Sequence, residues 1–496
     1  MIKLTRKDVI SMFKLLRVDV FLVLFNISSV IVHLSLNQLV EDKICLNELK
    51  LNQSICLNIE NVDESREADK NYVLTRAAYY KNYQSLMITL PGIFLNLFVG
   101  CWLDSYPEHT KFILAVPTLG IFMDALLTII NCLQFKADYR FILIAAFFRG
   151  MGGDISIIYV GVYAYVTRKT LAEFRAVRFA VLEFFSAISF PISIYLGGLT
   201  LTSKPWIAGQ PRNYIGVYIL SGAFSLLAAV WALVLLNDSG EAVKQEEDEQ
   251  NGVGKESYKT SKLEAKTPSK PGKCLCSFIH AFSKIFKYEN LKAMMHTCFK
   301  KRENGLRCRI WHTIAIAFFI LSGYLSEVAI GFPFAQKVYH WNAKYYSKIS
   351  PLFMLLTSIS SSVVTPILVS KFAITDTKLS IIGCISLISS AAIRGFWLSS
   401  TGYIVSHSVG VLSGLQLISM RSFLARMIKS DEIGQIYSLL AAIEAFSPLL
   451  CNIFFTTVFN ATISFNPGIA YLISSASMIY PLVVDIWLDW TKSSWY

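Results

Sequence analysis

Residues 147–190 read FFRGMGGDISIIYVGVYAYVTRKTLAEFRAVRFAVLEFFSAISF, which is two long apolar segments joined by a short basic loop. The basic residues of that loop are Arg168, Lys169, Arg175 and Arg178. Inside the apolar segments lie Arg149, Asp154 and Glu183. Each would cost about 2.5–3.5 kcal/mol at the centre of a bilayer, so a membrane helix keeps such residues only where they face a partner, water or a substrate. The stretch predicts a membrane protein with ionisable groups in its interior, and we interpret it as a transporter.

Three glycines precede the acidic residue of this stretch. Gly150, Gly152 and Gly153 stand just before Asp154. Because they carry no side chain, a neighbouring backbone can come close on these turns. We therefore expect tight helix packing around Asp154.

The composition of the whole chain is that of a membrane protein. Of its 496 residues, 54% are hydrophobic and 16% are charged, which is too apolar for a soluble enzyme of this size. The apolar residues gather in about a dozen segments of roughly 20 residues, each long enough to cross the ~30 Å hydrocarbon core of a bilayer. A net charge of +12 would also fit a nucleic-acid-binding protein, but the excess lies mostly in loops that we assign to the cytosol. The expected partner is therefore the lipid bilayer and not nucleic acid.

The hydropathy pattern predicts an all-α polytopic fold with twelve transmembrane helices. The expected spans are Val18–Val40, Leu86–Leu103, Phe112–Gln134, Arg140–Val166, Val181–Leu201, Tyr214–Leu236, Trp311–Ala335, Ser347–Val369, Lys378–Trp397, Tyr403–Phe423, Ile436–Phe459 and Pro467–Trp487. The basic N-terminus precedes an uncleaved first helix, and an even number of spans returns the C-terminus to the same side. Both termini are expected in the cytosol, as the distribution of lysine and arginine also predicts.

The loop between the first two expected spans, Glu41–Tyr80, would be the longest on the opposite side. It carries Cys45, Cys56 and the glycosylation sequon Asn52-Gln53-Ser54. Disulfides and N-linked glycans both belong to an oxidising lumenal or extracellular compartment. We therefore expect a Cys45–Cys56 disulfide, with free thiols or a bridge to another loop as the alternatives. A second sequon, Asn460-Ala461-Thr462, falls in the expected loop between the last two spans, on the same side.

A polar linker, residues 237–310, divides the chain into two expected six-helix halves, 1–236 and 311–496. The first part of the linker is polar and low in aromatic residues, which indicates disorder. Its second part has apolar residues at helical spacing, which predicts an amphipathic helix along the inner membrane surface; they are Phe278, Phe282, Ile285 and Phe286. Cys274 and Cys276 are either acylation sites or plain reduced cysteines. Two pseudo-repeats with a cytosolic linker are the layout of a carrier with alternating access.

The short loop after the second expected span begins Gly100-Cys101-Trp102-Leu103-Asp104. This resembles the start of the GxxxDxxGRR loop of the major facilitator superfamily. Glu108 and His109 stand where that motif has arginines, so Lys111 is the basic residue that remains.

Further segments, taken in order, resemble one branch of that superfamily, the solute carrier 46 family, which includes the proton-coupled folate transporter. They are DKICLNELKLNQSIC at 42–56, Gly153-Asp154, RAVRFAVLE at 175–183, Gly197-Gly198, KYENLKAMMHTCFKKRENGLR at 287–307, and the segment from Met420-Arg421-Ser422 to Gly434. The resemblance runs nearly end to end. It implies the twelve-helix major facilitator fold, a small organic solute as the substrate and protons as the coupling ion.

By this resemblance, Asp154 and Glu183 occupy acidic positions that serve transport and proton coupling, and Arg421 occupies a basic position at the cytosolic end of helix ten. A carboxylate in a low-dielectric setting can load a proton near neutral pH, which removes the cost of moving a charge past closed gates. The chain departs from the family at Gly323, where the folate-carrying member has a histidine. This departure and the altered motif loop weaken folate itself as the expected substrate.

Other charged residues inside the spans are candidates for substrate binding or gating. Arg149 and Arg421 would attract an anionic solute. Asp124 lies at a similar depth to Arg149 on the adjacent helix, so an ion pair between them is the alternative. Further candidates, for which pairing between helices is again the alternative, are Glu327, Arg394 and Glu444.

We therefore expect a secondary active transporter, proton-coupled and specific for a small organic anion, in the plasma or lysosomal membrane. A membrane sensor or receptor that binds its ligand without moving it is an alternative. A membrane-embedded acyl or glycosyl transferase is a weaker one, because we find no H-x-x-x-x-D pair, metal-ligand cluster or nucleophile elbow at a membrane face. We accordingly expect no enzymatic activity, no cofactor and no metal.

Overall fold

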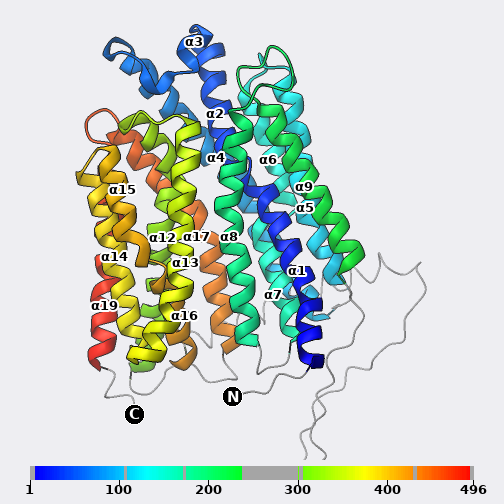
Figure 1. Cartoon of the computed structure of the whole chain (residues 1–496), viewed down its shortest axis with the longest axis vertical. Coiled ribbons are helices and arrows are strands. Elements are labelled where there is room, and N and C mark those ends of the chain that lie inside the picture. Colours follow the sequence, from blue (N-terminus) through cyan, green and yellow to red (C-terminus); the bar gives the residue numbers. More distant parts are fainter. Residues whose placement is uncertain are drawn as a thin grey trace, which may run out of the picture.

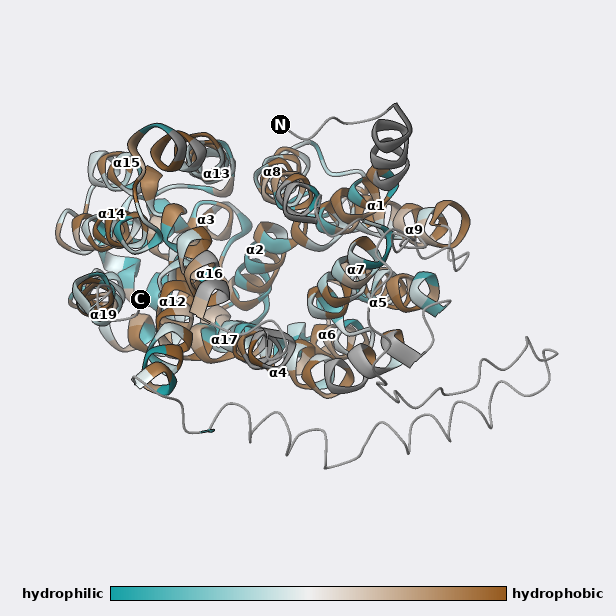
Figure 2. Ribbon diagram, turned by 90° about the horizontal axis from the view of Figure 1, so that it is seen from below, coloured by the Kyte–Doolittle hydropathy of each residue, from teal (hydrophilic) through white to brown (hydrophobic). Residues whose placement is uncertain are grey.

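The computed structural model describes residues 6–105, 109–170, 175–236, 300, 305–427 and 433–491, and every regular element in these ranges is a helix. Ten helical segments among them are long and apolar enough to cross a membrane. The long helices run side by side in two groups, residues 6–236 in one and residues 305–491 in the other (Figures 1 and 2). The chain is a multi-pass membrane protein with an all-helical fold, as the hydropathy pattern predicts.

The first group contains α1 (Arg6–Val30), α2 (His33–Lys43), α4 (Glu67–Ser105), α5 (Thr110–Leu133), α6 (Ile142–Met151), α7 (Asp154–Lys169), α8 (Arg175–Leu201) and α9 (Tyr214–Leu235). The short elements between α2 and α4 are η1 (Ile44–Glu48), α3 (Gln53–Cys56), η2 (Ile59–Asn61) and η3 (Glu64–Arg66), and η5 (Tyr139–Phe141) precedes α6. Within this group α5 packs against α6 and α9, and α1 packs against α8 and α9.

The second group contains α12 (Leu306–Val338), α13 (Ala343–Phe372), α14 (Asp376–Phe396), α15 (Ser400–Val409), η8 (Gly410–Leu412), α16 (Leu415–Met427), α17 (Ile433–Thr462), α18 (Ile469–Ser477) and α19 (Ile479–Trp490). The two groups meet where α8 packs along α13 and α4 packs along α17 (Figure 2).

The two ends of the bundle differ in what they carry. α1 begins and α19 ends at the lower end in Figure 1, which we call the terminus side. α3 lies at the upper end, which we call the disulfide side because a Cys45–Cys56 disulfide is found there.

Large apolar side chains cover the outside of the bundle. Val234, Phe396 and Trp490 are 72%, 78% and 84% exposed. Exposure of this kind over a helical surface is normal where lipid, and not water, covers the protein.

Helix four of the prediction is interrupted beside its acidic residue. The span is divided into α6 and α7, and Gly153 and Asp154 between them have φ angles of 87° and 44°. Glycine adopts this left-handed backbone without a steric cost, and aspartate tolerates it better than most residues. The interruption places the Asp154 carboxylate at the first residue of α7. The first, tenth and twelfth expected spans are also divided into two helices each.

The expected close approach around these glycines is confirmed. A Cβ atom on Gly150 would lie 2.4 Å from the Met87 carbonyl oxygen of α4. A Cβ atom on Gly152 would lie 3.1 Å from the Cα atom of Gly120 in α5. The glycines therefore let the backbones of α4 and α5 pack directly against α6 and its end.

The predicted loop Glu41–Tyr80 is wrong in its extent. The first span continues through α2 to Lys43, and α4 begins at Glu67, nineteen positions before the expected Leu86. Residues 67–85 are rich in alanine, lysine and other good helix formers, so the helix continues beyond the apolar part. Hydropathy marks only the portion of a helix that lies in lipid.

Two residues expected in loops lie within helices. Asn460 is in the last turns of α17, where its Nδ2 donates to the Thr75 carbonyl at 3.5 Å, so the surroundings give its expected glycosylation no support. Asn52, by contrast, is exposed just before α3. Arg178 is buried within α8 and donates to both carboxylate oxygens of Asp19, at 2.8 and 2.6 Å. In both cases the helix extends past the apolar run that defined the prediction.

The predicted amphipathic helix of the linker, together with Cys274 and Cys276, lies outside the described residues.

Candidate functional site

Arg149 is the centre of a buried charge cluster at the interruption between α6 and α7. Its Nε donates to Asp154 Oδ1 at 2.9 Å, its Nη1 lies 3.9 Å from Asp124 Oδ2, and its Nη2 donates to the Ser29 hydroxyl. The three charged side chains are between 8% and 17% exposed. The contact between Asp124 and Arg149 is confirmed, and Asp154 is a second partner that the prediction did not foresee.

The charges in this cluster do not balance when all are ionised. Two carboxylates share one guanidinium, so one acid can accept a proton while Arg149 keeps an ionised partner. Low-dielectric surroundings favour arrangements without net charge. With all three groups ionised, the cluster carries one net negative charge.

A second cluster joins the two helix groups. Arg421 of α16 donates through Nη2 to both carboxylate oxygens of Glu444 in α17, at 2.9 and 3.0 Å. Its Nη1 lies 3.9 Å from Glu183 Oε1 of α8, in the other group, and the Tyr163 hydroxyl of α7 donates to the same carboxylate. The side chains of Arg421 and Glu183 are 38% and 50% exposed. This cluster is open to its surroundings, whereas the Arg149 cluster is buried.

Asp154 and Glu183, which the resemblance assigned to one role, thus lie in separate clusters with separate arginines. A polar row accompanies Glu183 across α1, α7 and α8. Asn26 Nδ2 donates to the Ser189 hydroxyl at 2.9 Å and to the Ser186 hydroxyl at 3.3 Å, and the Ser186 and Tyr159 hydroxyls bond to each other.

Glu327 and Arg394 form an ion pair inside the second helix group. Arg394 Nη1 and the Tyr471 hydroxyl both donate to Glu327, the latter at 2.6 Å. The guanidinium of Arg394 also lies 4.6 Å from the centroid of the Tyr471 ring. Since α12, α14 and α18 all belong to one group, the observed contacts are those of pairing between helices.

Gly323, at the position of the family's histidine, faces an apolar surface. A Cβ atom there would lie 2.9 Å from Leu387 Cδ2 and 3.3 Å from the Met478 sulfur. A side chain at this position would therefore displace the ends of the Leu387 and Met478 side chains.

The motif loop of the prediction falls at the ends of two helices. Gly100 and Asp104 are in the last two turns of α4, and Lys111 is in the first turn of α5. Arg168, at the end of α7, donates from Nη1 to the Leu103 carbonyl at 3.0 Å. The superfamily motif has its arginines in the loop after the second span. In this chain, Arg168 of α7 contacts the end of α4 instead.

Polar contacts between the two groups gather on the disulfide side. Gln336 Nε2 of α12 donates to Glu41 Oε2 of α2 at 2.8 Å. Lys81 Nζ of α4 donates to the carbonyls of Val328 and Ala329 in α12 at 2.9 and 3.0 Å.

Three further contacts join α4 to the second group on this side. The Asn452 amide and the Thr456 hydroxyl of α17 both donate to Asn82 Oδ1, at 3.1 and 2.5 Å, and Lys337 donates to Glu67. We call the contacts made by Glu41, Lys81 and Asn82 with the second group the disulfide-side gate. We call this gate closed when these contacts are formed, as they are in this structure.

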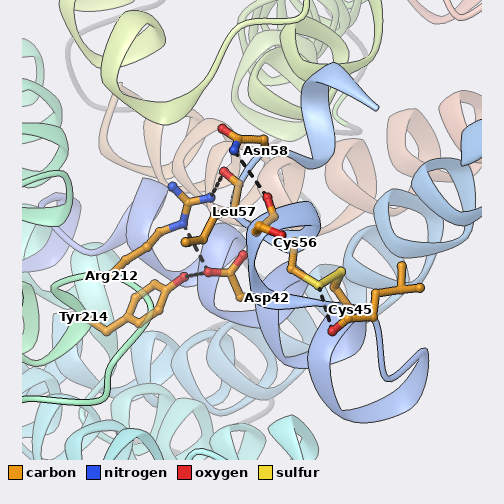
Figure 3. Close-up of a disulfide and its surroundings, with 9 residues drawn as sticks. Asp42, Cys45, Cys56, Leu57, Asn58, Arg212 and Tyr214 are labelled. Atoms are coloured by element: carbon orange, nitrogen blue, oxygen red, sulfur yellow. Dashed lines mark hydrogen bonds and ion pairs between the residues drawn. A yellow bond between two sulfur atoms is a disulfide. The ribbon is translucent and has the colours of Figure 1, made fainter. Parts of the chain in front are cut away.

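The segment that follows α2, residues 44–66, is held by a disulfide and by an ion pair at the end of α2 (Figure 3). The Cα atoms of Cys45 and Cys56 are 5.7 Å apart across the disulfide. Asp42 Oδ2 accepts from Arg212 Nε at 3.1 Å and from the Tyr214 hydroxyl at 2.5 Å, and Arg212 Nη2 donates to the Leu57 carbonyl at 2.9 Å.

The same segment contacts the second helix group through Glu60. Its carbonyl accepts from Lys70 Nζ at 2.8 Å and from His340 Nδ1 at 2.7 Å. Burial lowers the pKa of Lys70 to about 8 and raises the pKa of the Glu60 carboxyl. The segment is therefore packed closely enough to desolvate both side chains.

The residues of the disulfide-side gate were not predicted from the sequence. Glu41 was assigned to a loop because it follows the apolar run of the first span, and Gln336 is uncharged. The spacing of Gln38 and Glu41, three residues apart, was a signal that the helix continues, since such residues share a helix face. Tyr163 was missed because a tyrosine in a membrane helix is ordinary.

Comparison with known proteins adds to this geometry. Residues 77–451 match the family model described as Major Facilitator Superfamily. A Drosophila melanogaster protein named "Probable peptidoglycan muropeptide transporter SLC46" is 24% identical over 209 residues, 41% of this chain and 40% of that relative, so the alignment spans less than half of either. The Bos taurus proton-coupled folate transporter is 19% identical over 83% of this chain and 79% of its own.

Among solved structures, the human organic anion transporter MFSD10 superposes with a TM-score of 0.60. The match covers 95% of this chain and 98% of that one, at 11% sequence identity. At this identity the likeness is one of fold.

Proposed function

Because this chain belongs to the Major Facilitator Superfamily, we propose that it is a proton-coupled carrier of a small organic anion that works by alternating access. Members of this family move solutes across membranes, so the chain is a transporter and not an enzyme. The observation that carries the proposal is the partly exposed Arg421, which lies between carboxylates of both helix groups. A carrier needs such a site, because its two halves move relative to each other around the substrate.

Arg421 is the residue that would bind the anion. Its guanidinium presents several donors in one plane, which suits a carboxylate of the substrate. Glu183 competes for the same donors at 3.9 Å. A proton on Glu183 removes that competition, so proton and anion bind together. This linkage is what couples the two fluxes.

The buried Arg149 cluster would hold a second proton. Because the cluster has two acids and one arginine, either Asp154 or Asp124 can be neutral while the other remains ionised beside the buried Arg149. Neutralising the cluster lowers the cost of moving it between conformations.

The distribution of contacts supports a carrier open toward the terminus side. On the disulfide side, the gate contacts between the two groups are formed. Glu183 and Arg421 also face each other between the groups, but their side chains are accessible to solvent. We infer that the terminus side is cytosolic and the disulfide side lumenal or extracellular, because Cys45–Cys56 and the exposed Asn52 sequon fit an oxidising compartment. The plasma and lysosomal membranes both satisfy this orientation.

The names of the relatives narrow the substrate to be tested. One names a muropeptide and another names folate, and both kinds of molecule carry carboxylates. Gly323 stands where the folate-carrying member has a histidine, and this departure favours an anion other than folate itself.

Uptake into vesicles that contain the purified full chain tests the proposal. A muropeptide and a folate are offered separately as radiolabelled solutes, with and without an imposed pH gradient. We expect at least one to be taken up faster with acid on the disulfide side. Glu183→Gln should lose the pH stimulation, and Arg421→Ala should lose uptake.

The matched control is Arg140→Gln, which removes an arginine that is exposed on the disulfide side and lies 3.9 Å from Asp138. It should leave uptake unchanged. Uptake that is equally fast in Arg421→Ala, or stimulation by the pH gradient that persists in Glu183→Gln, would contradict the roles given to these residues.

A further inference from the structure

Glu41 is a buried carboxylate within the disulfide-side gate. It is 1% exposed, and its Oε2 accepts from Gln38 at 2.5 Å and from Gln336 at 2.8 Å. Its Oε1 is buried without a hydrogen-bond partner among the described residues. The Oε1 of Gln336, in the opposite helix group, is also buried without a hydrogen-bond partner among the described residues. Two acceptors in this gate therefore lack a donor.

The charged groups around Glu41 are already committed to other partners. Arg212 pairs with Asp42, and Lys81 donates to two backbone carbonyls of α12. On α2 itself, His33 is partly buried, and Lys43 donates to the carbonyls of Asn131, Phe135 and Ala137. Further titratable groups on the elements around α2 include Lys70, bonded to the Glu60 carbonyl, and Tyr80 on α4; Tyr214, bonded to Asp42, and Tyr218 on α9; Glu48 on η1, near Arg76; Glu327 and Lys337 on α12, paired with Arg394 and Glu67; Lys344 and Lys348 on α13, both exposed; and Arg178 and Glu183 toward the other end of α8. Glu41 forms no ion pair with a described residue.

One proton supplies what this arrangement lacks. A protonated Glu41 can donate from its hydroxyl to Gln336 Oε1 while Gln336 Nε2 donates to the other carboxyl oxygen. An acid and a primary amide then satisfy each other with two hydrogen bonds. Without the proton, the closed gate buries a carboxylate that has no cation beside it, and such burial is strongly unfavourable.

We propose that Glu41 is a proton-binding site of the disulfide-side gate, occupied when the gate is closed and emptied to the disulfide side when it opens. The inference rests on the proposed alternation between two open states. In the open gate Glu41 meets water and ionises. In the closed gate it is sealed from both sides, so its proton returns to the side from which it came.

This proton differs from the one at Glu183. Glu183 is half exposed while the gate is closed, so it can release a proton toward the terminus side. Glu41 instead sets how readily the gate closes. Acid on the disulfide side should hold the gate closed, and neutral pH there should release it.

The test uses a cysteine at Thr456, which is 1% exposed in the closed gate and bonded to Asn82 of the other group. A charged, membrane-impermeant methanethiosulfonate is applied to the disulfide side of sealed vesicles that carry the full chain. Ser464→Cys, at an exposed position in the connection between α17 and α18 on the same side, gives the intrinsic effect of pH on the reagent. The measured quantity is the labelling rate of Thr456→Cys divided by that of Ser464→Cys.

We expect this ratio to rise with the pH on the disulfide side, by at most about tenfold per pH unit, the limit for one titrating proton. Glu41→Gln should keep the ratio low at every pH, because the substituted amide is permanently uncharged. Glu41→Asp should restore a dependence on pH. A ratio independent of pH with Glu41 intact, or the same pH dependence in Glu41→Gln, would overturn the proposal.

The proposed carrier function is measured separately, as uptake driven by a pH gradient. If uptake depends on Glu183 while the pH dependence of the labelling ratio is the same with and without Glu41→Gln, only the inference about Glu41 fails. If no variant shows uptake or labelling at any pH, alternating access itself fails.

Discussion

Charged residues in this chain differ in how completely their neighbours compensate them. Asp154 is mostly buried and is the closest anion to Arg149, whereas Glu183 is half exposed and lies 3.9 Å from its arginine. Removing one partner of a buried ion pair leaves an uncompensated charge, which costs about 3–5 kcal/mol. An exposed pair contributes about 0–1 kcal/mol. The two acids should therefore respond differently to neutralisation.

We expect Asp154→Asn to lower both the stability and the transport activity of the protein, and Glu183→Gln to lower only transport. Asparagine accepts the positive φ at position 154, so the substitution changes the charge without straining the backbone. Asp124 remains near Arg149 and should keep the loss at the lower end of the range. The measurements are the thermal unfolding midpoint of the purified protein and solute uptake. Equal midpoints for Asp154→Asn and the unmodified chain would contradict this account.

The glycines beside Asp154 make a second prediction at this scale. Gly150→Ala should lower the free energy of unfolding by about 1–3 kcal/mol, because its Cβ would lie 2.4 Å from the Met87 carbonyl and α4 would have to move. Gly222→Ala is the control, since the nearest atom to its Cβ would be 3.6 Å away, an ordinary contact. The unfolding midpoints of the two variants, compared side by side, decide the matter. A midpoint lowered as far by Gly222→Ala would show that small residues matter here for another reason.

At the scale of elements, the positions of most helices were predictable and their ends were not. Hydropathy located α5 and α9 to within two residues, because both helices are apolar along their whole length. It missed the first nineteen residues of α4, which form a helix outside the apolar run. The pairing of Asp124 with Arg149 followed from depth alone. The contact of Arg421 with Glu183 did not, because it depends on how two groups of helices approach each other.

The disulfide segment, residues 44–66, is an element whose packing should depend on pH. Burial raises the pKa of the Glu60 carboxyl above its ordinary value of 4.5. The folded state therefore binds a proton more tightly than the unfolded state. Stability from this group is fully present below pH 4.5 and is lost as the pH rises through the raised pKa.

We accordingly expect the segment to be more protected from amide hydrogen exchange at pH 5 than at pH 7.5, after correction for the intrinsic rates. Glu60→Gln should remove the difference and leave protection high at both values. Peptides from α19, which ends on the terminus side, serve as the internal reference. Loss of protection on acidification would reverse the sign and exclude Glu60 as the responsible group.

At the scale of the whole molecule, two adjacent glycines of α8 have different roles. One allows close packing within a helix group, and the other allows close contact between the two groups. A Cβ on Gly197 would lie 2.2 Å from the Ile31 carbonyl, within the first group. A Cβ on Gly198 would lie 2.0 Å from the Cβ of Ser347 in α13, across the two groups. One glycine therefore permits a helix group to pack, and the other permits the two groups to meet on the disulfide side.

Gly198→Ala should thus fold normally but fail to close the gate, whereas Gly197→Ala should be unstable. For Gly198→Ala we expect an unchanged unfolding midpoint, slow uptake, and rapid labelling of Thr456→Cys from the disulfide side even at acidic pH. Protonation of Glu41 cannot then act, because α8 and α13 are held apart before Gln336 comes within reach. Slow labelling of Thr456→Cys in the Gly198→Ala background would mean that the groups close elsewhere, and the contact between α8 and α13 would not limit the motion.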